Sequence, residues 1–117
     1  MSSLTTHVLD TANGIPAKGV MIKLFKFSGG IRTRVRDTVT NKEGRTDVPI
    51  LSEEYFVPNI YELEFYVGDY FRGVGGTISD PPFLDVVPVR FSVVDHTAHH
   101  HVPLLVSPWS YTTYRGS

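Results

Sequence analysis

The 117-residue sequence has no cysteine, only three alanines and a formal net charge of -1. Without cysteine there is no disulfide, no thiolate nucleophile and no cysteine-ligated zinc. A near-neutral charge disfavours nucleic acid as a partner, because phosphate binding is typical of chains with a basic excess. No apolar run approaches the roughly 18 residues of a membrane span, and the N-terminus lacks the features of a signal peptide. We therefore expect one cytoplasmic domain over residues 1–117, without membrane or nucleic-acid partners.

Residues that favour strands dominate the sequence. Val, Ile, Thr, Phe, Tyr and Trp supply 46 of the 117 residues, whereas alanine, the best helix former, is scarce. Glycines and prolines divide the chain into short segments. Strands are predicted over residues 4–9, 20–27, 31–40, 45–48, 60–67, 84–94 and 101–111, a helical turn near 52–54, and either helix or strand over 69–74. Seven or eight short strands at this spacing predict an all-β antiparallel sandwich.

Two histidines lie on the second face of otherwise buried strands. Strand alternation places Val102, Leu104 and Val106 on one apolar face, which we assign to the core, and His101 on the opposite face. His7 occupies a comparable, partly apolar face of the first strand. Such a face is typically covered by another subunit or by a ligand. His7 and His101 are therefore candidate functional residues, although strand histidines with a purely structural role are the more common case.

The histidine-rich run at residues 96–101 suggests a second hypothesis. Imidazole is the commonest protein ligand for zinc, and His99 and His101, two residues apart on a strand, can chelate one ion. A zinc site would need a third ligand and an ordered surrounding shell, and His7 could supply the ligand. Metal binding is thus an alternative at this point, although we expect no metal or other cofactor.

Two further segments carry polar groups that could face a ligand. Arg45 follows Gly44 in a turn, where arginines are usually solvated. The C-terminal segment 111–117 continues from a hydrophobic strand and carries a tyrosine, an arginine and a terminal carboxylate, which together can hold a polar, planar anion. Phosphate-loop and serine-hydrolase signatures are absent, so those enzyme classes are not indicated.

Three stretches of the chain together resemble the 5-hydroxyisourate hydrolases, also called transthyretin-related proteins. They are LTTHVLD at residues 4–10, Gly44-Arg45 after the central turn, and HHHVPLLVSPWSY at residues 99–111 followed by the terminal YRGS. The resemblance covers essentially the whole chain, and Tyr-Arg-Gly-Ser is its most specific element. His100 is one departure, since the family often has tyrosine there. It should face away from His101, so we expect little consequence.

The resemblance implies a transthyretin-like (prealbumin-like) β-sandwich with one short helix, assembled as a homotetramer (a dimer of dimers) with sites at the subunit interface. It also implies cofactor-free hydrolysis of 5-hydroxyisourate, the product of urate oxidase, to 2-oxo-4-hydroxy-4-carboxy-5-ureidoimidazoline. The catalytic residues of the family correspond to His7, Arg45 and His101. Its C-terminal tail corresponds to Tyr114, Arg115, Gly116 and Ser117, of which Tyr114, Arg115 and Ser117 are expected to bind substrate.

Transthyretin-type carriers of thyroid hormone are the alternative, because one fold can serve both functions. These carriers resemble the chain at residues 8–10 and 107–108 but lack the two histidines, the arginine and the terminal YRGS. The resemblance therefore favours the hydrolase. In that reaction one histidine would take a proton from water while Arg45 stabilises negative charge. The sequence leaves open which histidine is the base.

Overall fold

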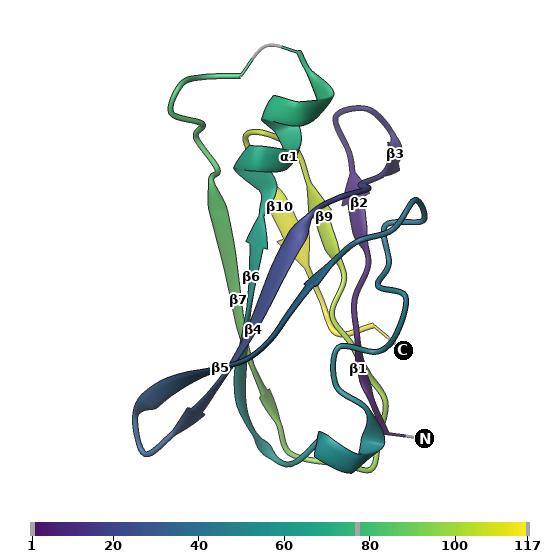
Figure 1. Cartoon of the computed structure of the whole chain (residues 1–117), viewed down its shortest axis with the longest axis vertical. Coiled ribbons are helices and arrows are strands. Elements are labelled where there is room, and N and C mark those ends of the chain that lie inside the picture. The colour runs from purple at the N-terminus through teal and green to yellow at the C-terminus, as the bar shows by residue number, and fades with distance from the viewer. Residues whose placement is uncertain (1, 77, 117) are drawn as a thin grey trace.

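The computed structural model describes residues 2–76 and 78–116, in which the strand-favouring segments form β-strands arranged in stacked layers (Figure 1). The strands are β1 (Leu4–Thr5), β2 (Val8–Asp10), β3 (Ile15–Pro16), β4 (Met21–Ser28), β5 (Ile31–Val39), β6 (Asn59–Tyr66), β7 (Val86–Val93), β8 (His100–His101), β9 (Leu104–Val106) and β10 (Tyr111–Thr113). The helices are α1 (Val67–Val74) and the short 3-10 helix η1 (Glu53–Tyr55).

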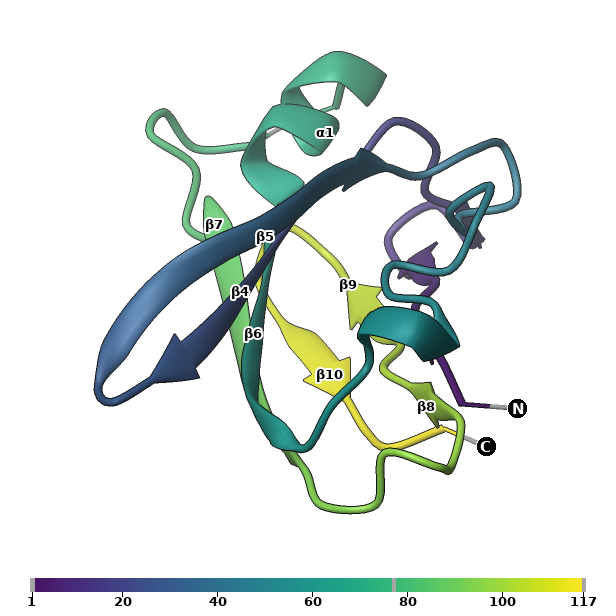
Figure 2. The same cartoon turned by 60° about the horizontal axis from the view of Figure 1, so that its bottom comes forward.

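Two four-stranded sheets, β5-β4-β6-β7 and β10-β9-β2-β3, enclose the core, and the short pair β1-β8 lies at one end (Figure 2). Large side chains from the strands and loops fill the space between the sheets, among them the fully buried Tyr61, Phe56 and Phe65. The predicted hairpin of residues 20–27 and 31–40 is the antiparallel pair β4-β5. The predicted all-β sandwich with one short helix is confirmed.

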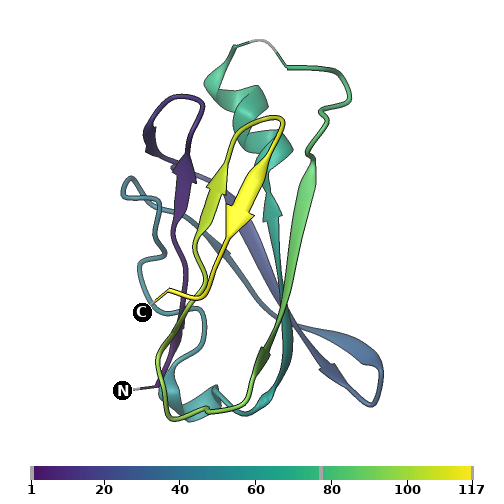
Figure 3. The same cartoon turned by 180° about the vertical axis from the view of Figure 1, so that it is seen from behind.

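The N-terminal strands β1 and β2 lie beside β8 and β9 and run parallel to them, as the view from behind shows (Figure 3). Strand β1 pairs in parallel with β8, and β2 pairs in parallel with β9. The backbone N–H of Val102 donates to Thr5 and that of Leu104 to His7, each at 2.9 Å. The sheet β10-β9-β2-β3 is therefore mixed, because its other two pairs are antiparallel. The sequence pattern predicted only antiparallel pairing. Hairpin signals reveal sequential neighbours, but they carry no information on how distant strands pair.

The predicted last strand at residues 101–111 is divided into three pieces. Pro103 separates β8 from β9 because proline has no N–H to donate to a strand ladder. A tight turn then separates β9 from β10, in which the Ser107 hydroxyl oxygen accepts the backbone N–H groups of Trp109 and Ser110. The tail beyond this turn folds back as an edge strand, which places it near the histidines.

The predicted strand at residues 45–48 is wrong. Arg45 makes a single β-bridge with His7, after which the chain leaves the sheet. The Thr46 hydroxyl donates to the carbonyl oxygen of Val48, and this contact closes a local loop instead of a strand ladder. The chain rejoins the N-terminal strand at the bridge between Leu51 and Leu4, so the loop lies beside the edge of β1 and β2.

The segment at residues 69–74, predicted as helix or strand, belongs to helix α1. The helix closes one end of the sandwich (Figure 1) and buries Val67, Tyr70 and Phe71 against it. Among the described residues, no helix has the length and apolar character needed to cross a bilayer. The cytoplasmic location stays a prediction.

A buried carboxylate on β2 joins α1 to the sheet β10-β9-β2-β3. Asp10 is fully buried and accepts the backbone N–H groups of Ala12 and Asn13, each at 3.0 Å. The hydroxyl of Tyr70 donates to the same carboxylate at 2.9 Å. Burial, together with this contact to Asp10, raises the pKa of Tyr70 above its ordinary value. The tyrosine therefore stays a donor throughout the accessible pH range.

We expect Tyr70→Phe to lower the free energy of unfolding by about 1.5 kcal/mol, because a buried carboxylate loses one of its donors. Urea denaturation followed by tryptophan fluorescence measures this loss. Tyr55→Phe is the matched control, since the Tyr55 side chain is 65% exposed. Equal unfolding midpoints for the two variants would contradict a stabilising role for the Tyr70 hydroxyl.

Candidate active site

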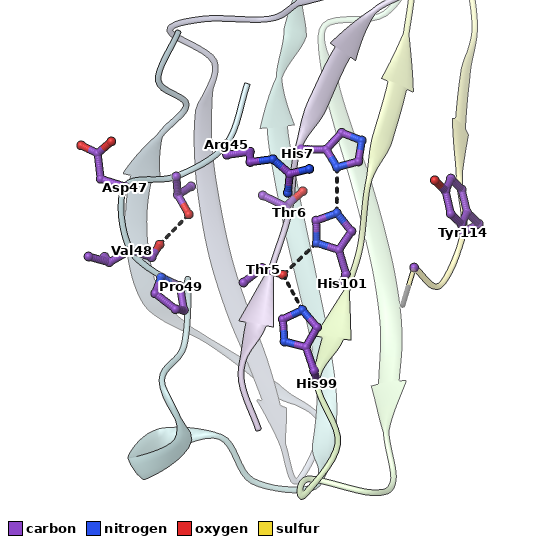
Figure 4. Close-up of a pocket in the computed structure, with 12 residues that line it drawn as sticks. Thr5, Thr6, His7, Arg45, Asp47, Val48, Pro49, His99, His101 and Tyr114 are labelled. Carbon is purple, nitrogen blue, oxygen red and sulfur yellow. Dashed lines mark hydrogen bonds between the residues drawn. The ribbon is translucent and has the colours of Figure 1, made fainter. Parts of the chain in front are cut away.

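A cavity of about 490 Å³ opens on the outward face of β1 and β2 (Figure 4). Its lining residues are Thr5, Thr6, His7, Arg45, Thr46, Asp47, Val48, Pro49, His99, His101, Tyr114 and Gly116. The walls come from three distant parts of the chain: the N-terminal strands, the loop at residues 45–49 and the C-terminal region. The structure thus brings together His7, Arg45, His101 and Tyr114 of the residues singled out from the sequence.

His7 and His101 meet because of the parallel strand register. Thr5 pairs with His101, so His7, two residues further along, lies diagonally next to His101 on the same face. His7 Nδ1 and His101 Nε2 are hydrogen-bonded at 2.7 Å, with ring centroids 4.9 Å apart. A hydrogen bond between two imidazole nitrogens contains one hydrogen, so one ring donates and the other accepts. We call these two residues the histidine pair.

The hydrogen bonds continue from the histidine pair along the strand (Figure 4). His101 Nδ1 is bonded to Thr5 Oγ1 at 2.7 Å, and the same hydroxyl is bonded to His99 Nε2 at 3.0 Å. His99 Nδ1 is bonded in turn to Ser3 Oγ at 2.8 Å. Both ring nitrogens of His101 are therefore engaged, whereas His7 Nε2 has no hydrogen-bond partner within residues 2–76 and 78–116.

A turn that requires glycine presents Arg45 to the histidine pair. Gly44 has φ +75°, and a Cβ atom there would lie 2.5 Å from the carbonyl oxygen of Val8. The side chain of Arg45 points toward His7 and His101 in Figure 4. It forms no ion pair with any carboxylate in the described part of the chain. Its guanidinium can therefore donate to an oxygen of a bound ligand.

The surroundings of the histidine pair favour neutral rings. Burial, and to a smaller degree the charge of Arg45, lowers the pKa of His7 below its ordinary value of 6.5. For His101, burial combined with the positive charges of His7, Arg45 and His99 lowers the pKa to about 4. Both rings are consequently neutral near pH 7, which is the state in which an imidazole can accept a proton.

The C-terminal tail packs directly on His101. The backbone N–H of Gly116 donates to the carbonyl oxygen of His101 at 2.7 Å. A Cβ atom at residue 116 would lie 2.8 Å from His101 Cδ2, so only glycine fits this contact. Tyr114 lines the cavity, whereas Arg115 lines a separate cavity of about 210 Å³ bordered by β7. Ser117, also predicted to bind substrate, lies outside the described residues.

The zinc hypothesis required His7, His99 and His101 to surround one ion. In the structure the nitrogens of His7 and His101 face one another in a hydrogen bond, and the Thr5 hydroxyl separates His101 from His99. Within residues 2–76 and 78–116, no three His, Cys, Asp or Glu side chains are placed to hold a metal ion. His7, His101 and His99 thus form a hydrogen-bonded row through Thr5.

Sequence reasoning did not assign Thr5 to the site, and it considered His99 only as a metal ligand. The signal that identifies them is the same alternation that places His7 and His101 on one face. Residues 3, 5 and 7 of the first strand face the same way, as do residues 99 and 101 near the last. Because residues two apart share a face, Thr5 and His99 are expected beside the histidine pair.

The model of the HIUase/Transthyretin family matches residues 4–116 of the chain. A 5-hydroxyisourate hydrolase of Ralstonia nicotianae is 56% identical over 117 residues, which are the whole of both chains. A 5-hydroxyisourate hydrolase of Deinococcus radiodurans is 54% identical over 114 residues, covering 97% of this chain and 95% of its own.

Solved structures with the same fold include proteins of different function. A structure of (S)-allantoin synthase superposes with a TM-score of 0.92 at 45% identity, covering 98% of this chain and 43% of that one. The 5-hydroxyisourate hydrolase of Klebsiella pneumoniae gives 0.80 at 31% identity, over the whole of both chains. Sea bream transthyretin in complex with thyroxine gives 0.87 at 30%, covering 97% of this chain and 94% of that one. The predicted transthyretin-like fold is confirmed.

The lowered pKa values of the histidine pair predict a pH-dependent stability. The unfolded chain takes up protons at a higher pH than these buried rings, so stability decreases as pH falls from about 6.5 toward 4. Between pH 7 and 5.5, His101 alone is expected to cost about 1 kcal/mol. Urea denaturation at the two pH values measures the change. His101→Gln should reduce it, whereas the exposed control His96→Gln should leave it as in the wild type. An undiminished pH dependence in His101→Gln would contradict the assignment.

Proposed function

The chain belongs to the HIUase/transthyretin family, and we propose that it hydrolyses 5-hydroxyisourate by means of His7, Arg45 and His101. The observation that carries this proposal is the convergence of these three residues in one cavity. They come from three separate regions of the chain. A purely structural role explains neither a guanidinium without an ion pair nor a His7 Nε2 without a hydrogen bond among residues 2–76 and 78–116. An accepting imidazole nitrogen beside a cationic donor is suited to adding water to a carbonyl group.

The hormone carrier is the second candidate, because sea bream transthyretin shares the fold at 30% identity. Imidazoles, a guanidinium and threonine hydroxyls line the present cavity. A largely apolar ligand seated there would bury these groups without replacing their hydrogen bonds to water, which is costly. Relatives with 54–56% identity over nearly the whole chain are hydrolases. The polar cavity and these relatives both favour hydrolysis.

The geometry favours His7 as the residue that contacts the reacting water. Both nitrogens of His101 are occupied, by His7 and by Thr5, so His101 has no free lone pair to offer to the cavity. His7 is bonded to His101 through Nδ1, which leaves Nε2 for water. His101 accordingly orients the ring of His7 and fixes which nitrogen faces the substrate. This distinction between the two histidines could not be made from the sequence.

The proposed reaction needs one proton transfer to His7 Nε2 and one back from it. The oxygen of water attacks a ring carbonyl carbon of 5-hydroxyisourate while its proton passes to His7 Nε2. The guanidinium of Arg45 donates hydrogen bonds to the carbonyl oxygen, on which negative charge develops. The intermediate then collapses, the C–N bond breaks, and the ring nitrogen takes the proton from His7 Nε2. The product is 2-oxo-4-hydroxy-4-carboxy-5-ureidoimidazoline, and the enzyme returns to its starting state.

The predicted homotetramer fits the exposed edges of the sandwich. Strands β7 and β10 are the last strands of their sheets, and β10 is exposed along its length. An unpaired edge strand is a ready surface for pairing with a second copy. In such a dimer of dimers, the tail residues Tyr114, Arg115 and Ser117 would complete the substrate site at a subunit interface. Arg115 lies beside β7, away from the cavity of its own chain, so it would contribute to a substrate site shared with another subunit.

We expect His7→Ala, Arg45→Ala and His101→Ala each to lower turnover of 5-hydroxyisourate by about 10²-fold or more. The substrate is generated in place by urate oxidase, and its ultraviolet decay is followed with and without the protein. The exposed residues Arg36 and His96 lie outside the cavity lining. Their variants Arg36→Ala and His96→Ala serve as matched controls and should keep wild-type turnover. Full activity in all three cavity variants would refute the mechanism.

We expect the active protein to be a particle of four chains. Light scattering coupled to gel filtration measures its mass, and activity is assayed across the eluted peak. Removal of residues 114–117 should depress turnover, because these residues complete the interface site. A monomeric peak with full turnover would contradict sites formed between subunits.

A further inference from the structure

The row of hydrogen bonds does not end at the two histidines that the proposed reaction uses. It runs from His7 through His101, Thr5 and His99 to Ser3, and every link is 3.0 Å or shorter. We propose that Thr5 and His99 form a proton relay, which carries a proton from the histidine pair to the exposed His99 and back during turnover. This inference rests on the proposed hydrolase function and assigns a role to two residues beyond the catalytic set.

Two hydrogen-bond arrangements of this row have Thr5 donating to one imidazole neighbour and accepting from the other. They run in opposite directions, because the hydroxyl has a single hydrogen to donate. When Thr5 donates to His99, it accepts from His101 Nδ1, and His101 Nε2 accepts from His7 Nδ1. This leaves a lone pair on His7 Nε2, so His7 is a base. When Thr5 donates to His101, every bond reverses, and His7 carries its hydrogen on Nε2 as an acid.

Transfer of one proton along the row converts the first arrangement into the second. A proton from water binds His7 Nε2, and the Nδ1 hydrogen of His7 moves to His101 Nε2. The Nδ1 hydrogen of His101 moves to Thr5 Oγ1, and the original hydroxyl hydrogen of Thr5 moves to His99 Nε2. His99 becomes the cation, and His7, His101 and Thr5 are neutral again. The reverse transfer returns the proton to the leaving ring nitrogen, so no other reactant is needed.

The charges around the row explain why a proton would leave the histidine pair. A cation on His101, which is 8% exposed, would be poorly hydrated and close to the guanidinium of Arg45. His99 is exposed, so solvent can stabilise its positive charge. Of the described residues that line the same cavity, Asp47 carries a carboxylate, and it makes no hydrogen bond to a described member of the row. Moving the charge to His99 therefore lowers the cost of accepting a proton at His7.

Bound substrate makes this route more important. In the proposed reaction the substrate and the attacking water occupy the side of the cavity that His7 Nε2 faces. Proton exchange with bulk solvent through that nitrogen is then blocked. Among the residues that the structure describes, the second nitrogen of His7 is bonded to His101, and the second nitrogen of His101 is bonded to Thr5. His99 is the first exposed titratable group along this path.

Two substitutions at Thr5 separate a relay from simple packing. Thr5→Val keeps the branched shape and removes the hydroxyl, and Thr5→Ser keeps the hydroxyl. We expect kcat of Thr5→Val to fall about tenfold, which is less than the roughly 10²–10⁴-fold that direct proton transfer contributes to catalysis, because Thr5 acts through His101. KM should be unchanged, because Thr5 acts through His101 and not on the substrate. Thr5→Ser should retain most of the wild-type kcat.

The relay also predicts a chemical rescue that a structural role would not produce. His99→Ala should lower kcat by a similar factor and leave an exposed space beside the Thr5 hydroxyl. Free imidazole can occupy that space and accept the proton, so kcat of His99→Ala should rise with imidazole concentration. Thr5→Val should show no such rise, because the link to the histidine pair is missing. His96→Ala is the control and should keep wild-type kcat at every imidazole concentration.

These measurements distinguish failure of the relay from failure of the proposed function. If the wild-type protein accelerates decay of 5-hydroxyisourate while Thr5→Val and His99→Ala match its kcat, the relay is refuted and the hydrolase stands. Equal losses in Thr5→Ser and Thr5→Val, or losses in His99→Ala that imidazole does not restore, also refute the relay. If the wild-type protein leaves the decay unchanged, the proposed function itself is wrong.

Discussion

The hydrogen bond between His7 and His101 is the interaction on which the site depends. It contains one hydrogen between two nitrogens 2.7 Å apart, so it orients both rings and gives them opposite donor and acceptor roles. Burial and the nearby guanidinium of Arg45 keep the rings neutral, which preserves one nitrogen as a proton acceptor. The positive charge of Arg45 stabilises the developing oxyanion. The same charge disfavours protonation of the two imidazoles, so it keeps the base unprotonated.

The fold supports this bond through strand register and two close backbone approaches. Parallel pairing of β1 with β8 sets Thr5 opposite His101, and a slip of one residue would turn a histidine toward the core. Gly44 allows the loop that carries Arg45 to approach the carbonyl of Val8, and Gly116 allows the tail to lie against His101. The core between the sheets thus determines the site geometry, although the reacting side chains face away from it.

Local periodicity explains which parts of the site the sequence predicts. The alternation that places Val102 and Leu104 in the core also places His101 on the opposite face, and the structure confirms this arrangement of side chains. Strand direction and pairing depend on contacts between distant segments, so the parallel chain ends and the loop at residues 45–48 could not be read in this way. The association of Arg45 with the histidines came from the family resemblance, because a turn arginine has no periodic signal. The connection from His101 to His99 needs atomic positions, since it depends on which way one hydroxyl faces.

The most direct test of this account is a crystal structure with a planar, non-hydrolysable analogue of 5-hydroxyisourate bound. The account predicts that the analogue occupies the cavity of about 490 Å³, with a polar atom or an ordered water hydrogen-bonded to His7 Nε2 and a carbonyl oxygen hydrogen-bonded to Arg45. The bond between His7 and His101 should persist in the complex. An analogue bound elsewhere, or one that contacts His101 after the two rings have separated, would contradict it.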